Sequence, residues 1–124
     1  MIALDSSSLI AFFSGDSGAD VEVVDMAFDQ KQAVLPPVVL AEILSDPHLD
    51  SGLARLMMEV PRLSIKEGYW ERVGDLRARI IAKGFRARLA DSLIAQNCLD
   101  NDVSLVTRDS DFRHFARFAS LKLL

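Results

Sequence analysis

Short apolar runs alternate along this chain with longer segments in which apolar residues recur at helical spacing. Ile2 and Leu4 mark the first run, which stops at Asp5 and leads through three serines into a helix over residues 9–13. This order predicts a buried strand that ends at a carboxylate and turns directly into a helix. Further strands are predicted at residues 33–35, around Leu63 and Ile65, at residues 103–106 and at residues 121–124.

Helices are predicted between these strands, at residues 19–30, 38–44, 50–59, 67–82, 87–99 and 112–118. In the longest of them, Trp70, Val73, Leu76 and Ile80 recur at helical spacing, which predicts that Trp70 anchors the core. Strands that alternate with helices at these lengths are typical of a parallel sheet covered on both faces. The predicted fold class is therefore α/β, a three-layer α/β/α sandwich in a single domain over residues 1–124.

The amino-acid composition indicates which cell compartment to expect. A chain of 124 residues, 50% of them hydrophobic, is large enough to bury a core without disulfides or metals. Its single cysteine, Cys98, lies on an apolar helix and is expected to be buried, which is compatible with a reducing cytoplasm. No signal peptide and no apolar segment near the roughly 18 residues that span a bilayer are found. We therefore expect a cytoplasmic protein with no membrane partner.

Charge is distributed unevenly along the chain. The net charge of −4 argues against a general coat for nucleic acids. Residues 1–61 nevertheless carry a net −8 and residues 62–124 a net +4. Six basic residues cluster in this second half: Arg72, Arg77, Arg79, Lys83, Arg86 and Arg88. Two interpretations stay open for them, a basic strip that binds phosphates and the solvated face of an amphipathic helix.

Four carboxylates stand out by their positions. Asp5 and Asp109 each directly follow an apolar strand, and parallel strands bring both to the same edge of the sheet. Glu42 has apolar neighbours within its helix, and Asp91 begins an apolar run. Acids gathered in one crevice repel each other unless a cation neutralises them, and oxygen ligands of this kind suit Mg²⁺ or Mn²⁺. Held there, such ions activate water for phosphodiester cleavage.

A simpler interpretation stays open for each acid taken singly. Asp5, Asp91 and Asp109 all lie near predicted helix N-termini, where an acid is favourable by roughly 0.3–1 kcal/mol through the helix dipole. Glu42 fits equally well as a side chain that points to solvent. The joint placement at strand ends weakens this interpretation.

Four ordered blocks of sequence resemble the signature blocks of PIN domains, and most closely those of the VapC-type ribonuclease toxins of toxin–antitoxin pairs. Each block alone is weakly specific, but the ordered set is specific and covers essentially the whole chain. The blocks are Asp5-Ser6-Ser7-Ser8-Leu9-Ile10, Ala41-Glu42, Ala90-Asp91-Ser92-Leu93-Ile94-Ala95 and Leu105-Val106-Thr107-Arg108-Asp109-Ser110-Asp111-Phe112.

The resemblance implies a PIN-like sandwich with an acidic site for Mg²⁺ or Mn²⁺, formed by Asp5, Glu42, Asp91 and Asp109. It also implies that hydroxyls near the metal orient the aspartates, and that one further acid is less regularly part of the site. The hydroxyls belong to Ser7 and Thr107, and the further acid is Asp111. The sequence departs from the family pattern at Ser6, where Thr is more usual, and at Gln96-Asn97, where small apolar residues are more usual.

The activity that follows is that of a metal-dependent endoribonuclease acting as a toxin, with RNA as its substrate. Arg86, Arg88 and Arg108 are candidates for guiding RNA phosphates to the acidic pocket. The family resemblance further implies a homodimer and a cognate VapB-like antitoxin. The alternative function is a non-catalytic α/β binding module or a receiver-like signalling module, which would need a lysine at the end of a late strand. The only late lysine is Lys122.

Overall fold

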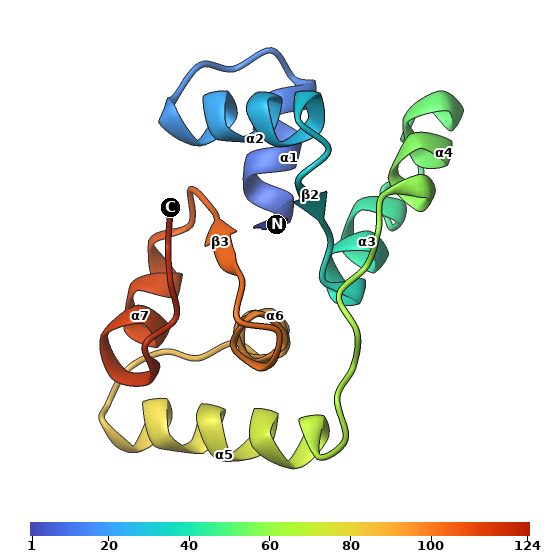
Figure 1. The fold of residues 1–124 in the computed structure, drawn as a ribbon. Coiled ribbons are helices and arrows are strands. Elements are labelled where there is room, and N and C mark those ends of the chain that lie inside the picture. The colour runs from blue at the N-terminus through green and yellow to red at the C-terminus, as the bar shows by residue number, and fades with distance from the viewer.

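A three-stranded parallel sheet in the order β2-β1-β3 lies at the centre of the molecule, which is described here over residues 1–124 by a computed structural model. Helices α1 and α2 lie on one side of this sheet, and α6 and α5 lie on the other (Figure 1). The strands are β1 (Ile2–Leu4), β2 (Ala33–Val34) and β3 (Ser104–Val106), and the helices are α1 (Ser6–Phe13), α2 (Ala19–Asp29), α3 (Pro37–Leu44), α4 (Ser51–Glu59), α5 (Tyr69–Ala82), α6 (Leu89–Asp100), the 3₁₀ turn η1 (Ser110–Phe112) and α7 (Arg113–Ala119).

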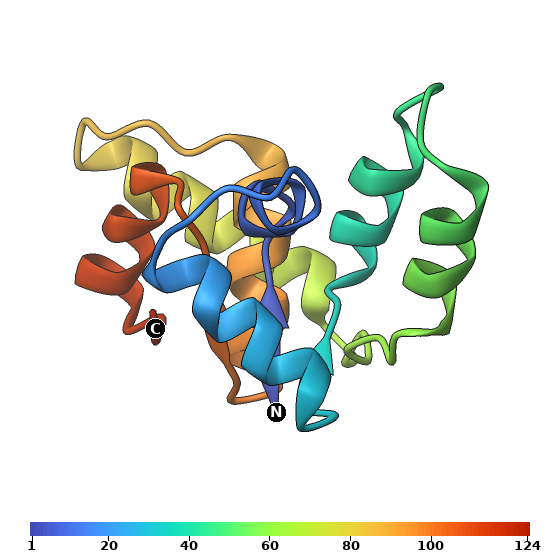
Figure 2. The ribbon, with the colours of Figure 1, turned by 90° about the horizontal axis from the view of Figure 1, so that it is seen from above.

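Local sequence explains where several helices begin. Pro37 opens α3 directly after Pro36, and proline is favourable there because the first helical N–H has no partner within the helix. The Asp50 carboxylate caps α4 by accepting a hydrogen bond of 3.1 Å from the Leu53 N–H. The α3–α4 pair projects from one side of the molecule, opposite α7 (Figure 2).

The core forms where both faces of the short sheet meet helices. Ala3 and Leu4 of β1 and Leu105 and Val106 of β3 are all fully buried. Cys98 on α6 is also fully buried, as predicted. The arrangement of helices on both faces of the sheet agrees with the predicted α/β/α fold class.

No helix is both long and apolar enough to cross a membrane.

Two predicted strands are wrong. The segment around Leu63 and Ile65 contributes only an isolated bridge between Leu35 and Arg62. The C-terminal segment likewise contributes a single bridge, between Leu105 and Leu123. Both segments lie beside an outer strand of a sheet whose strands are only two or three residues long, so neither extends into a ladder.

The prediction that Trp70 anchors the core is also wrong. Trp70 is 66% exposed on the surface of α5, whereas Tyr69 beside it is 1% exposed. The Tyr69 hydroxyl donates a hydrogen bond of 2.6 Å to the Leu93 carbonyl, which satisfies the buried phenol. Tyr69 is therefore the aromatic anchor that joins α5 to α6.

Candidate metal centre

The carboxyl ends of β1 and β3 lie side by side, as the sequence predicts. Leu4 is the register partner of Val106, and the Asp5 N–H donates a hydrogen bond of 2.9 Å to the Val106 carbonyl. Asp5 is 4% exposed, and its Oδ2 accepts hydrogen bonds from Ser7 Oγ at 2.6 Å and Thr107 Oγ1 at 2.7 Å. These two hydroxyls fix the orientation of the Asp5 carboxylate at the floor of the site.

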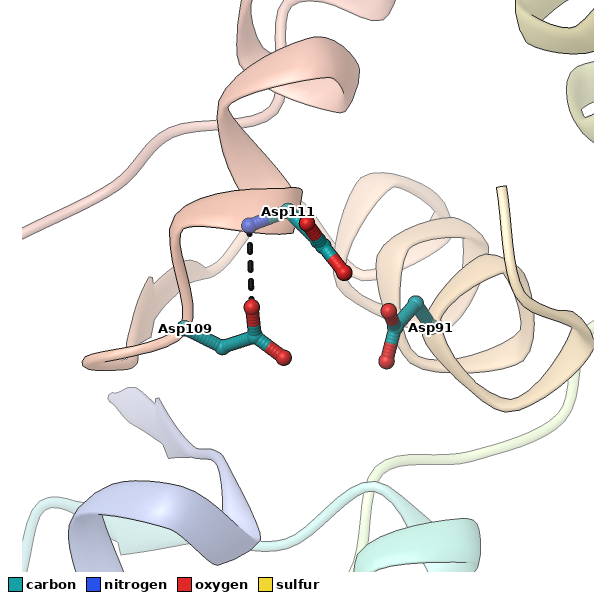
Figure 3. A group of neighbouring side chains, drawn as sticks. All are labelled: Asp91, Asp109 and Asp111. Atoms are coloured by element: carbon teal, nitrogen blue, oxygen red, sulfur yellow. Dashed lines mark hydrogen bonds between the residues drawn. The ribbon is translucent and has the colours of Figure 1, made fainter. Parts of the chain in front are cut away.

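Three further carboxylates converge beside this edge. Asp91 in the first turn of α6 faces Asp109, which follows β3, and Asp111 in η1 (Figure 3). One oxygen from each carboxylate lies within 4.8 Å of the others. The Asp111 N–H donates a hydrogen bond of 2.9 Å to Asp109 Oδ1, which holds the turn that brings Asp111 into place. We call Asp91, Asp109 and Asp111 the acidic triad.

The triad differs from the predicted set of four. The structure brings Asp91 and Asp109 together as expected, but their close companion is Asp111, which the resemblance ranks lower. Asp5 and Glu42 are not members of this compact group. The Asp-Ser-Asp spacing at residues 109–111 is the sequence signal for this placement, since a carboxylate that accepts a hydrogen bond two residues ahead makes an Asx turn.

Glu42 faces the site from α3 on its exposed side. Its Oε1 accepts a weak hydrogen bond of 3.3 Å from Ser6 Oγ, which belongs to the helix that follows Asp5. Desolvation raises the pKa of the Glu42 carboxylate, and the Asp5 charge raises it further, against the hydrogen bond from Ser6. The residue as a whole is exposed, so what links Glu42 to the site is the charge of Asp5 and the hydrogen bond from Ser6.

Electrostatic repulsion is strongest at Asp91. Partial burial raises the pKa of Asp91 to about 6, and the charges of Asp109, Asp5 and Asp111 contribute to that rise, while Arg88 opposes it. The Asp91 carboxylate forms no ion pair, although Arg88 is close enough to be felt. Asp5 thus couples to both Asp91 and Glu42, so the four predicted acids share one electrostatic field.

Helix capping accounts for only one of these acids. Asp5 occupies the N-cap position of α1, but its side chain makes no capping hydrogen bond. Asp91 lies within the first turn of α6, where its charge is favoured by the helix dipole. Only Asp109 caps an element, η1, through Oδ1. The structure therefore leaves most carboxylate oxygens of the site without a capping role.

The three candidate arginines lie in different environments. The Arg108 Nε and Nη2 atoms donate to Asp20 at 2.8 and 3.0 Å, and Nη1 lies 3.7 Å from Asp16. Ser8 Oγ donates to the same Asp20 carboxylate at 2.9 Å. Arg108 is therefore committed to an ion pair that ties the β3 end to α2. Arg86 and Arg88 are exposed and form no ion pair.

Comparison with known proteins identifies the family. The family model for the PIN domain matches residues 2–118. The chain belongs to the PIN-domain family. This confirms the likeness that the four sequence blocks indicate. A search among curated protein sequences found no match.

Several solved structures share the PIN fold seen here. A VapBC2 structure from Rickettsia felis, bound to a DNA fragment from its promoter, has a TM-score of 0.71 and 20% identity, covering 100% of this chain and 98% of that one. FitAcB from Neisseria gonorrhoeae has a TM-score of 0.72 at 16% identity, with 100% and 96% coverage. VapBC-5 from Mycobacterium tuberculosis, a member of the VapBC family of toxin–antitoxin systems, has a TM-score of 0.67 at 19% identity, with 98% and 95% coverage.

The acidic triad fits a divalent cation by its chemistry. All its donors are carboxylate oxygens, which suit hard ions such as Mg²⁺ and Mn²⁺ and disfavour Zn²⁺ or Cu⁺, whose sites draw on nitrogen and sulfur. Burial is the largest cause of the raised pKa of Asp91, and repulsion by the charges of Asp109, Asp5 and Asp111 adds to it. A bound cation would remove that repulsion, so the residues present fit the metal that the PIN family implies.

Proposed function

We propose that this PIN-domain protein is an endoribonuclease that depends on Mg²⁺ or Mn²⁺ and acts as the toxin of a toxin–antitoxin pair. The observation that carries the proposal is the acidic triad, which converges beside the oriented carboxylate of Asp5 at the carboxyl edge of the sheet. The family match and the fold shared with VapBC structures support the same function.

The residues divide the work by position. Asp91, Asp109 and Asp111 would hold a cation, and Ser7 with Thr107 would keep Asp5 aimed at it. Glu42 would add negative charge from the α3 side. The cation supplies Lewis-acid chemistry that activates water and stabilises the charge on a scissile phosphate. Neither histidine of the chain, His48 or His114, belongs to the acidic set, so the proposed reaction uses no histidine as acid or base.

The receiver-like alternative receives no support from the geometry. Its required late lysine is Lys122, whose Nζ lies 2.8 Å from Asp102 Oδ1 in an exposed ion pair. Lys122 is therefore bound to a surface carboxylate and does not join the acidic triad.

The test is cleavage of a panel of single-stranded and looped RNAs with Mg²⁺, with Mn²⁺ and with EDTA. The variant Asp109→Asn keeps the shape of the side chain and removes its charge, and Asp25→Asn on the exposed side of α2 is the matched control. We expect cleavage by the wild type and by Asp25→Asn in either metal, and none by Asp109→Asn or in EDTA. Cleavage that persists in EDTA or in Asp109→Asn would contradict the proposal.

A VapB-like antitoxin and a homodimer are the proposed partners. A cavity of about 220 Å³ between α1, α3 and α4 offers an apolar contact surface beside Glu42, lined by Ile10, Phe13, Ile43 and Leu53. An antitoxin segment seated there would contact Glu42. Size-exclusion chromatography with light scattering tests the dimer, and a Leu53→Asp variant that still binds the co-expressed antitoxin would exclude this cavity as the contact.

A further inference from the structure

Three aromatic rings form a stack outside the acidic site. The Phe85 ring lies between His114, with centroids 4.6 Å apart and planes at 31°, and Phe118, with centroids 5.2 Å apart and planes at 36°. His114 and Phe118 are four residues apart on α7, so they share one face of that helix. All three residues are half-buried, and Phe85 and Phe118 also pack against the hydrophobic core.

Two cations lie against one ring of this stack. Lys83 Nζ lies 5.0 Å from the centroid of the Phe118 ring, and the Arg117 guanidinium carbon lies 4.8 Å from the same centroid. Arg86 and Arg113 lie beside them in the sequence and are exposed. None of these four cations forms an ion pair, whereas the ion-paired cations elsewhere are Arg72, Arg79, Arg108 and Lys122.

The position of the stack links it to the acidic triad. Phe85 and Arg86 belong to the segment between α5 and α6, and that segment leads directly to Asp91 in the first turn of α6. His114 lies three residues after Asp111. Figure 2 shows this segment passing along the α7 side of the molecule to the end where α6 and α1 begin. The stack and two of the acids are therefore carried by the same two segments of the chain.

We propose that this surface binds single-stranded RNA next to the cleavage site; we call it the aromatic–cationic platform and define it as Lys83, Phe85, Arg86, His114, Arg117 and Phe118. Unpaired bases stack on aromatic rings irrespective of sequence, and unpaired cations neutralise the flanking phosphates. The proposal rests on the proposed nuclease function and adds how an acidic site that repels phosphates retains its substrate. It also gives a role to three of the twelve lysines and arginines in residues 62–124.

The experiment measures binding of a fluorescent 12-nucleotide single-stranded RNA of mixed sequence by anisotropy in EDTA, so that no cleavage occurs, at several salt concentrations. The platform variant is Lys83→Gln with Arg117→Gln. The matched control is Lys31→Gln with Arg55→Gln, which removes one lysine and one arginine that are exposed and form no ion pair. A third variant, His114→Ala, removes one aromatic ring of the stack and leaves the aliphatic core side chains in place. Each protein is also tested for Mn²⁺ binding and for its melting temperature.

We expect the platform variant to raise the Kd for the RNA by about tenfold and to flatten the dependence of log K on log salt by roughly 0.7 for each phosphate that the protein no longer neutralises. His114→Ala should weaken binding of the single strand by roughly fivefold and leave binding of an RNA duplex unchanged. The control should bind as the wild type does. The platform variant should keep Mn²⁺ binding and the melting temperature, which a role confined to packing α7 against the α5–α6 segment would not predict, and His114→Ala should keep Mn²⁺ binding.

Equal losses of affinity in the platform and control variants, or tighter binding of duplex than of single strand, would overturn the proposal. So would a wild type that does not bind the single strand at all. These outcomes can be told apart from failure of the nuclease proposal. Metal-dependent RNA cleavage at a normal rate without binding at the platform would contradict the platform and support the nuclease. Binding at the platform without metal-dependent cleavage would support the platform and contradict the nuclease.

Discussion

Two groups of aspartates in this molecule show how the same side chain serves chemistry or structure. In the acidic triad, burial and neighbouring acids raise the pKa of Asp91 to about 6. Beside the triad, a hydrogen bond from Arg108 lowers the pKa of Asp20 to about 2, against the effect of burial. Asp100, at the far end of the α6 helix that carries Asp91, accepts bonds of 3.0 and 2.7 Å from Arg72.

The two groups of aspartates differ in whether a basic side chain of the protein forms an ion pair with the carboxylate. Asp20 and Asp100 each have an arginine at hydrogen-bond distance, so their carboxylates stabilise the fold. The acidic triad has none, and the fold therefore keeps its charges in mutual repulsion. Such an arrangement costs stability, and it indicates a site that a ligand of opposite charge completes.

The largest expected change is in the rate of RNA cleavage, and it should differ between substitutions at the two ends of α6. Asp91→Asn should reduce the rate of RNA cleavage by about a hundredfold or more, because it removes a proposed ligand charge. Asp100→Asn removes an acid from the same helix and should change the rate by less than about threefold. Cleavage rates at saturating Mn²⁺ measure both. Equal losses of rate in the two variants would remove the distinction between the groups.

The second prediction concerns pH. Since the folded pKa of Asp91 is raised to about 6 from 3.8, the folded protein binds this proton more tightly than the unfolded chain does. The metal-free protein should therefore lose stability as the pH rises through about 6, by about 1–2 kcal/mol once partial solvent exposure is allowed for. Mn²⁺ binding should follow the opposite course and weaken roughly tenfold for each pH unit below 6, since the ion competes with the proton.

Melting temperatures and calorimetric Mn²⁺ titrations between pH 5 and pH 7.5 give both curves. The control is Asp91→Asn, which should flatten the stability curve. A metal-free wild type that is more stable at pH 7.5 than at pH 5 would show that Asp91 does not titrate as described.

The third prediction concerns the structural acids. Arg72→Gln should lower the free energy of unfolding, and by more than Arg108→Gln does, because the Asp100 side chain, 9% exposed, then keeps only its hydrogen bond from Gln96. Mn²⁺ binding should not change. Urea denaturation measures the stability, and the double variant Arg72→Gln with Asp100→Asn should recover part of the loss.

The smallest expected effect lies at Arg108. Its ion pair is partly exposed, so Arg108→Gln should lower the free energy of unfolding only slightly. Because the guanidinium is committed to Asp20, RNA affinity should fall by less than about threefold, against about tenfold for the platform variant. Anisotropy titrations compare the two. A larger loss of affinity for Arg108→Gln would restore the phosphate-guiding role that the sequence predicts for it.

The sequence predicts which edge of the sheet carries the acids, whereas the close approach of Asp111 depends on local turn geometry. Asp5 and Asp109 follow apolar strands that pair in parallel, so their meeting at one edge follows from the order of the elements. Asp111 joins the acidic triad only because the turn after β3 folds back through the Asp109 carboxylate, a detail of turn geometry. The partner of Arg108 was not predicted either, since Asp20 lies 88 residues away.

The errors in the fold have equally local causes. Trp70 and Tyr69 both fit a helical repeat with Val73 and Ile80, and a one-residue change of phase decides which ring is buried. The two predicted strands that are absent had apolar residues at the right spacing. A strand also needs a neighbour long enough to pair with, and apolar spacing alone does not provide one.

The acidic triad is tested most directly by a calorimetric titration of the metal-free wild type with Mn²⁺ at pH 7.5, beside Asp109→Asn and Asp20→Asn. We expect saturable binding in the wild type and in Asp20→Asn, and at least a tenfold loss of affinity in Asp109→Asn. Absence of binding in the wild type, or equal binding in Asp109→Asn, would contradict the assignment of the acidic triad as a cation site.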